Sequence, residues 1–184
     1  VALLEMKPLR FSPAHALDGP AELVCSNSLK SDDAATAHGL LKSELRRLGS
    51  VVLQAADRTR VPAGTALAVD RHRFSQAVEE ILAGMPGIGF ERGVEVEKLP
   101  DGDVIVATGP LTAEKLAGEL ASHTASSDLY FYDALAPIVE ADSIDSSRVF
   151  AGSRWGRGGG DDYINCPMTR EVYLEFVHAL RAAP

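Results

Sequence analysis

Short apolar runs alternate with helical patterns along this chain, and this alternation constrains its fold more than any other feature. Helical spacing of apolar residues or helix-start signals mark four segments: 34–48, 71–83, 112–122 and a last helix from 169. Strand-like runs lie at residues 1–5, 65–69, 88–91, 94–99, 103–108, 129–134 and 138–141, with a further short apolar segment at 51–56. This order predicts a mixed α/β fold.

Two of these segments carry specific burial predictions. Residues 1–5 are apolar up to their final acid, as in a parallel strand that is buried on both faces. The last helix is expected to bury one apolar face, formed by Val172, Tyr173, Phe176, Val177 and Leu180.

The charge of the chain limits how it could bind nucleic acid. Its net charge is −8, so a surface that is basic throughout is excluded. Residues 42–73 nevertheless hold seven Lys and Arg against three acids: Lys42, Arg46, Arg47, Arg58, Arg60, Arg71 and Arg73. Such a local basic stripe can contact phosphates, and a solvated helix face is the alternative of equal weight.

Several classes of protein are disfavoured by what the sequence lacks. No run of eighteen apolar residues is present, so we expect no membrane span. The two cysteines form no CxxC pair and no His cluster accompanies them, so we expect no metal site. A cytoplasmic protein with free thiols is the resulting prediction.

Both cysteines stand among polar and turn residues. Cys25 lies in the motif VCSNSL, and Cys166 lies in NCPMT just before the last predicted helix. Backbone N–H groups at a helix N-terminus favour a thiolate. Each cysteine is therefore a candidate reactive thiol, while an inert buried cysteine is the alternative of similar weight.

Two further features are typical of dinucleotide-binding proteins. An acid at the end of an apolar strand, as Glu5 is placed, can accept hydrogen bonds from the hydroxyls of an adenosine ribose. The segment Ala107-Thr108-Gly109 follows a strand-like run, and its small residues would allow a flavin nucleotide to approach the backbone. An ordinary strand with a glycine turn is the alternative at both places.

A set of motifs spread along the chain carries a family resemblance: EMKP at 5–8, PAH at 13–15, ELVCSNSL at 22–29, RVPAG at 60–64, AVDR at 68–71, ATGPLT at 107–112, YDA at 132–134, PIV at 137–139 and DYINCPMT at 162–169. They resemble the bacterial methylenetetrahydrofolate–tRNA-(uracil-5-)-methyltransferase family in content and in order. The related flavoproteins of the glucose-inhibited division A type have Cys-Asn-Pro where this chain has Cys25-Ser26-Asn27.

The resemblance implies an activity and its cofactors. Members of the family methylate C5 of the T-loop uridine at position 54 of tRNA. They take the methylene from 5,10-methylenetetrahydrofolate and the hydride from FAD, which NAD(P)H reduces. The family's two cysteines match Cys25 and Cys166. We expect Cys166 to be the nucleophile at C6 and Cys25 to be the general base or a thiol that handles the methylene.

The resemblance also suggests binding residues and domains. The cofactor-binding candidates are Glu5, Lys7, Ser26, Asn27, Ala107, Thr108 and Gly109. Arg154 and Arg157, in a Gly-rich loop, are candidates for contact with RNA phosphates, and solvated loop charges are the alternative of equal weight. A Rossmann-like FAD-binding region is expected over residues 1–111, followed by the start of an α/β insertion domain over 112–184.

The family's Gly-rich flavin turn and its C-terminal portion are not found in the sequence, so we expect a fragment that binds FAD weakly or not at all and is inactive alone. Two other functions remain open: a non-catalytic module that binds tRNA or a partner, and a flavoprotein oxidoreductase without an RNA substrate.

Overall fold

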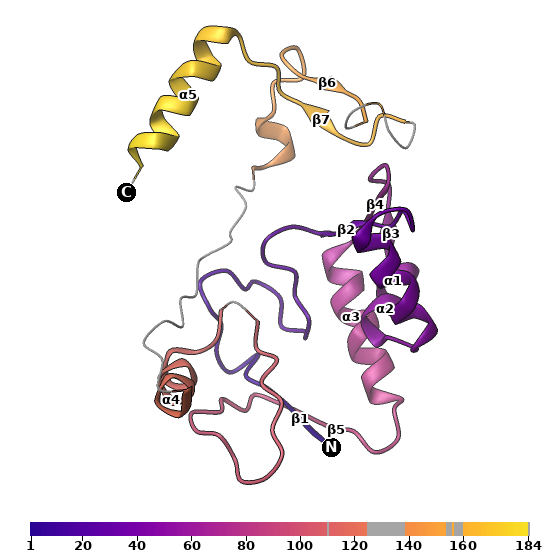
Figure 1. The fold of residues 1–184 in the computed structure, drawn as a ribbon, viewed down its shortest axis with the longest axis vertical. Helices are drawn as coiled ribbons and strands as arrows, with labels where there is room; N and C mark the ends of the chain where they lie inside the picture. Colours follow the sequence, from indigo (N-terminus) through magenta and orange to yellow (C-terminus); the bar gives the residue numbers. More distant parts are fainter. Residues whose placement is uncertain (110, 125–138, 154–155, 157–159, 184) are drawn as a thin grey trace. The chain divides into compact units, whose positions relative to one another are not determined.

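A computed structural model describes residues 1–109, 111–124, 139–153, 156 and 160–183 of the chain (Figure 1). Helices and strands are mixed along it, with a parallel strand pair among them, so the mixed α/β fold class is confirmed. The chain divides into two compact units, one formed by Val1–Val61 with Ala66–Ala136 and the other by Pro62–Thr65 with Pro137–Pro184. The predicted division at residue 111 stays a prediction, because compactness alone does not say which part binds a cofactor.

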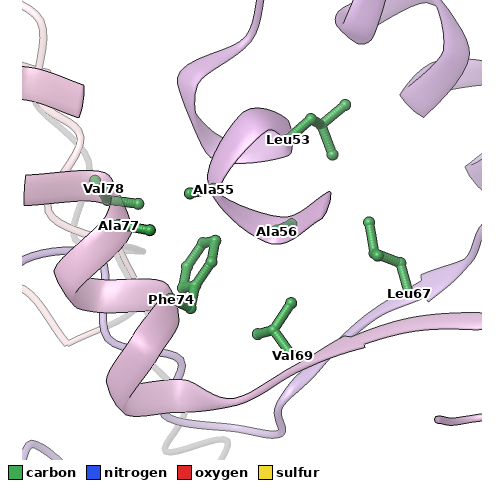
Figure 2. Close-up of a cluster of buried hydrophobic side chains, with 8 residues drawn as sticks. All are labelled: Leu53, Ala55, Ala56, Leu67, Val69, Phe74, Ala77 and Val78. Atoms are coloured by element: carbon green, nitrogen blue, oxygen red, sulfur yellow. The ribbon is translucent and has the colours of Figure 1, made fainter. Parts of the chain in front are cut away.

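The core of the first unit is a small antiparallel sheet covered by helices. Strand β4 (Ala66–Val69) lies between β2 (Ser28–Ser31) and β3 (Arg60–Val61). Helices α1 (Ala37–Arg47), α2 (Val51–Arg58) and α3 (Arg71–Ala83) complete this part. Figure 2 shows the buried cluster that α2, β4 and α3 form together: Leu53, Ala55, Ala56, Leu67, Val69, Phe74, Ala77 and Val78.

Local side chains define where these three helices begin. Thr36, Ser50 and Asp70 are the N-caps, and each accepts a hydrogen bond from a backbone N–H three residues later. The predicted helix over 71–83 is confirmed to the residue, and that over 34–48 is shorter by a few residues. The apolar segment 51–56 proves to be part of α2, because the Ser50 cap starts a helix there.

Strand β1 (Ala2–Glu5) pairs in parallel with β5 (Gly89–Arg92), in the register Leu3 to Phe90. The parallel direction agrees with the predicted Rossmann-like region, but the predicted burial of β1 is wrong. Within the described residues this sheet has only these two strands, so the side chains of β1 are not covered on both faces. Leu3 and Leu4 remain 37% and 38% exposed.

The segment between β5 and the next helix departs from the prediction. Residues 94–99 and 103–108 form no strand, and Ile105 is 92% exposed. Their apolar pattern fits a strand, but a strand also requires a neighbour that completes its backbone hydrogen bonds. Helix α4 (Glu114–Thr124) confirms the helix that was predicted after Thr112, and its Leu116 is buried.

The second unit is built from short elements. A 3-10 turn (Ala141–Ser143) precedes the antiparallel strands β6 (Phe150–Ala151) and β7 (Ile164–Asn165), and α5 (Arg170–Ala182) follows. The predicted strand at 129–134 lies outside the described residues, and residues 139–141 are not a strand.

The last helix forms as predicted, but its apolar face is not buried. Thr169 caps α5 by accepting a hydrogen bond from the N–H of Val172. Tyr173 and Phe176 are 55% and 48% exposed, because none of the described elements of the second unit covers this helix. Periodicity identifies which face of a helix is apolar, but it does not supply the surface against which that face packs.

Candidate functional site

Cys25 lies in an exposed bend that leads into β2. Two residues further on, Asn27 is bound to the buried strand β4 through both its side chain and its backbone. Its Nδ2 donates to the carbonyl oxygen of Val69 at 3.0 Å, and its own carbonyl accepts from the Val69 N–H at 2.9 Å. The C-terminal side of the Cys25 bend is therefore fixed to the core of the first unit.

The N-terminal side of the bend is fixed by Glu22, whose carboxylate forms a buried ion pair with Lys7. The two side chains are 5% and 3% exposed, and Lys7 Nζ lies 3.2 Å from Glu22 Oε2. The same carboxylate accepts hydrogen bonds from the backbone N–H groups of Ala16 and Leu17 at 2.9 and 3.1 Å. Burial alone would raise the pKa of Glu22, but these hydrogen bonds and the Lys7 ammonium hold it below its usual range.

Lys7 was predicted to bind a cofactor, and in the structure its ammonium already has three protein acceptors. Besides Glu22, these are the carbonyl oxygens of Leu17 and Gly19, at 3.0 and 2.5 Å. An ammonium group has three N–H donors, so all of them are used inside the protein. Cofactor binding by Lys7 stays a prediction, and its side chain as placed offers no free donor for it.

A histidine belongs to the same loop. His15 Nδ1 lies 2.7 Å from the hydroxyl of Ser12. Burial, and then the nearby positive charge of Lys7, lower the pKa of His15 from its usual value. The loop between Lys7 and Glu22 is thus closed by polar side chains rather than by an apolar cluster.

Glu5, the predicted ribose acceptor, is half-buried at the carboxyl end of β1. Its Oε1 accepts a hydrogen bond from the Lys7 backbone N–H at 3.0 Å. Glu5 does not line a hollow itself, but the residue after it does. The loop after β1 and the start of α4 line a hollow of about 320 Å³, formed by Met6, Arg10, Phe11, Ser12, Pro13, Leu111, Thr112, Ala113 and Glu114. An acid at a strand end beside a hollow is compatible with a nucleotide, so this part fits the FAD expectation.

The other predicted cofactor segment borders the same hollow. Ala107, Thr108 and Gly109 are exposed and directly precede the lining residues 111–114. Gly109 has a φ of +75°, with open space where a Cβ would stand, and the hydroxyls of Thr108 and Thr112 lie 2.5 Å apart. The structure thus brings the chain after Glu5 and the chain after Gly109 together, although they are about a hundred residues apart in sequence.

Ser26 and Asn27 differ in what they offer a ligand. Ser26 is exposed, and its hydroxyl accepts from the Ser28 N–H at 3.2 Å. The Asn27 amide is instead engaged with Val69. The cofactor role of both residues stays a prediction.

Cys166 belongs to the second unit, where it is exposed directly after β7. Two residues separate it from Thr169, which caps α5. The preceding Asn165 donates from its Nδ2 to the carbonyl oxygens of Gly152 and Tyr163, at 3.1 and 3.3 Å. Cys166 therefore precedes a helix, as predicted, and its role as a nucleophile stays a prediction.

The basic stripe of residues 42–73 separates into paired and unpaired charges. Arg46 binds both Asp32 and Asp57, and Arg60 also binds Asp32 at 3.0 Å. The buried Lys42 donates to the carbonyl oxygens of Ser31 and His38. Four arginines have no acidic partner within 4 Å among the described residues: Arg47, Arg58, Arg71 and Arg73. The stripe is therefore less basic than its sequence suggests.

The remaining predictions concern a membrane span, a metal site and two RNA-binding arginines, here compared with the part of the chain that the structure describes. No helix there is long and apolar enough to cross a membrane. No group of three or more His, Cys, Asp or Glu side chains is arranged there to hold a metal ion. The predicted RNA-binding residues Arg154 and Arg157 lie outside the described residues.

Comparison with known proteins decides the family. The family model described as glucose inhibited division protein A matches residues 1–184. The chain belongs to this family. It is 57% identical over 183 residues to a methylenetetrahydrofolate–tRNA-(uracil-5-)-methyltransferase TrmFO of Myxococcus xanthus, and 58% identical over 184 residues to the protein of the same name in Geobacter sulfurreducens. The resemblance inferred from the motifs is thereby confirmed.

The alignment covers nearly all of this chain but less than half of each relative. It covers 99% and 100% of this chain but 40% and 42% of the two relatives. The chain thus spans about two fifths of the length of the curated relatives that it matches.

Glu22 was not singled out by the sequence, because an acid in a loop is common and only its pairing with Lys7 distinguishes it.

Proposed function

We propose that this chain carries part of the active site of a folate- and FAD-dependent enzyme that methylates C5 of a uridine in tRNA, with Cys25 and Cys166 as its reactive thiols. The observation that carries the proposal is the placement of Cys25, which is exposed yet held on both sides by buried partners. The names of the relatives, which contain both the folate and the tRNA uracil, support the substrate assignment.

C5 of uracil is a poor nucleophile, and the two thiols assist its reaction in different steps. The Cys166 thiolate adds to C6 of the uracil, and the electron pair of the C5–C6 double bond then attacks the one-carbon electrophile of the folate. Cys25, as base, removes the proton from C5, and the electron pair left there breaks the bond between the one-carbon unit and the folate nitrogen, so that tetrahydrofolate leaves and a methylene group remains on C5. A hydride added to this methylene makes it a methyl group, the C5–C6 double bond forms again, and the C6–S bond breaks to release Cys166.

FAD is the group that would supply this hydride when bound, after reduction by NAD(P)H. Glu5, and the hollow between the loop after β1 and the start of α4, would hold its nucleotide portion. Ala107, Thr108 and Gly109 would allow its close approach to the backbone. Lys7 would act on the site indirectly, through the loop that it closes. A cytoplasmic location follows from the same proposal, because tRNA is modified there.

A chimera tests the function at the full length of the relatives. Residues 1–184 replace the matching segment of the Myxococcus xanthus protein, and methyl transfer to a tRNA transcript is measured with methylenetetrahydrofolate, FAD and NAD(P)H. We expect activity, and a loss of about 10²–10⁴-fold in both Cys25→Ser and Cys166→Ser. Met168→Ala, at an exposed neighbour of Cys166, is the control and should retain activity.

Covalent capture of RNA that contains 5-fluorouridine separates the two thiols, since an enzyme adduct at C6 cannot lose fluorine as it would lose a proton. Cys166→Ala should abolish capture, whereas Cys25→Ala should retain it. Undiminished capture by the Cys166→Ala chimera would contradict the assignment of the nucleophile.

The two alternative functions give different results in the same preparation. A chimera that shows flavin absorbance at about 450 nm but no methyl transfer would favour an oxidoreductase. A colourless chimera that still shifts tRNA in a gel would favour a non-catalytic binding module.

A further inference from the structure

We propose that Lys7 and Glu22 are positioning residues that hold Cys25 in place for reaction with the uracil. The proposal rests on the proposed function for the reaction itself, and it adds two residues that do not touch the reacting atoms. Its structural basis is the closed loop between Lys7 and Glu22, from which the chain leads directly into the Cys25 bend.

Lys7 is the residue around which the loop closes. Its ammonium reaches across ten, twelve and fifteen residues of sequence to Leu17, Gly19 and Glu22. Lys7 itself is 2% exposed, so water does not compete for these hydrogen bonds. A neutral side chain at this position would remove the Lys7 donor from two carbonyl oxygens and the counter-charge from the Glu22 carboxylate, which would keep its two backbone N–H donors.

Glu22 holds its end of the loop through hydrogen bonds to both carboxylate oxygens. Oε1 accepts from the Ala16 N–H, and Oε2 accepts from the Leu17 N–H and from Lys7. Every one of these partners precedes Glu22 in the sequence. The direction in which the chain leaves Glu22 is therefore set by the loop.

The chain leads from this loop to the Cys25 thiol within a few residues. Cys25 is three residues after Glu22 and two residues before Asn27, which is bound to β4. A segment of four residues, 23–26, thus joins two fixed points, and the thiol is exposed between them. Loss of the Lys7–Glu22 pair would release one fixed point and leave the other intact, so Cys25 would move more freely about Asn27.

Lys42 provides a matched control within the same unit. It too is buried, at 6% exposed, and its ammonium also donates to two backbone carbonyl oxygens. Those carbonyls belong to Ser31 and His38, which lie outside the segment between the two fixed points. Lys42→Met therefore removes a buried lysine of similar surroundings without loosening the Cys25 bend.

The first measurement is amide hydrogen exchange on the 184-residue chain, which requires no activity. In Lys7→Met and in Glu22→Gln, protection of residues 16–26 should fall by about tenfold or more, while β4 keeps its protection. Lys7→Arg, which retains the charge and N–H donors, should restore much of it. Equal protection in Lys7→Met and wild type, or equal loss in Lys42→Met, would overturn the proposal.

The second measurement distinguishes a change in the position of Cys25 from a change in the reactivity of its thiol. Iodoacetamide should alkylate Cys25 within about twofold of the wild-type rate in Lys7→Met, because an exposed thiol needs no placement to meet a small reagent. In the chimera, methyl transfer at saturating tRNA should fall about tenfold or more, with a similar half-saturating tRNA concentration. A parallel fall in alkylation and turnover would overturn positioning in favour of an effect on the thiol itself.

Failure of the proposed function is distinguishable from failure of this inference. If the wild-type chimera has no methyl transfer, the function is wrong, and the exchange experiment still decides whether the pair fixes the bend. If the chimera is active and Lys7→Met is equally active, the function stands and the positioning role is refuted.

Discussion

The two candidate thiols lie in regions that are built differently. The Cys25 bend is connected on one side to the buried core through Asn27 and on the other to a buried ion pair. The Cys166 segment follows a strand pair of two residues per strand and precedes an exposed helix. A thiol held by long-range buried contacts keeps its position in the isolated chain, whereas one held by short local contacts needs additional packing to do so.

The largest expected difference between the regions concerns two phenylalanines. Phe74 is 1% exposed in the core of α3, and Phe176 is 48% exposed on α5. We expect Phe74→Ala to lower the free energy of unfolding by about 3–5 kcal/mol, since it leaves a cavity. Phe176→Ala should change it by about 0.5 kcal/mol or less. Urea unfolding followed by circular dichroism measures both. Comparable losses would show that α5 is packed as firmly as the core.

A smaller difference is expected between two asparagines that flank the thiols. Asn27→Ala removes the hydrogen bond to the Val69 carbonyl beside the core and should lower the free energy of unfolding by about 1–2 kcal/mol. Asn165→Ala removes donors to Gly152 and Tyr163 in the exposed strand pair, where water can replace them. We expect about 0.5 kcal/mol or less there. The same unfolding assay applies, and the reverse order of the two losses would contradict the comparison.

The smallest effect is a dependence on pH that is confined to the loop beside Cys25. The pKa values of His15 and Glu22 are both lowered in the folded protein from their ordinary values of 6.5 and 4.5. The unfolded chain therefore binds protons that the folded chain does not, and the stabilisation is lost as pH falls. The His15 contribution should begin to fall near its ordinary pKa, and the Glu22 contribution should be present above pH 4.5 and be lost below it.

Amide protection factors, corrected for the intrinsic pH dependence of exchange, test this expectation. Residues 16–26 should lose protection between about pH 7 and pH 4 before β4 does. Glu22→Gln should remove the lower part of this dependence. A loop that opens together with the core, at one pH, would show that the Lys7–Glu22 pair is not a separate local structure.

Several elements could be predicted because their signals are local. The helix over 71–83 is specified by its apolar spacing and by Asp70, which directly precedes it and whose side chain accepts a hydrogen bond from the Arg73 N–H. The polar residues beside both cysteines left exposed and buried settings equally open, and the structure shows that both cysteines are exposed. Strand-like segments were less predictable. Residues 103–108 read as a strand but form none, because a strand depends on a partner that its own sequence does not specify.

The family resemblance, and with it the candidate thiols Cys25 and Cys166, came from the sequence alone, since motifs retain chemical information without a fold. The tertiary structure decided how Cys25 is held. The pairing of Lys7 with Glu22, and that of Asn27 with Val69, join residues fifteen and forty-two positions apart. Such contacts form only when the chain has closed its loops, and the free energy of loop closure depends on the whole fold rather than on neighbouring residues.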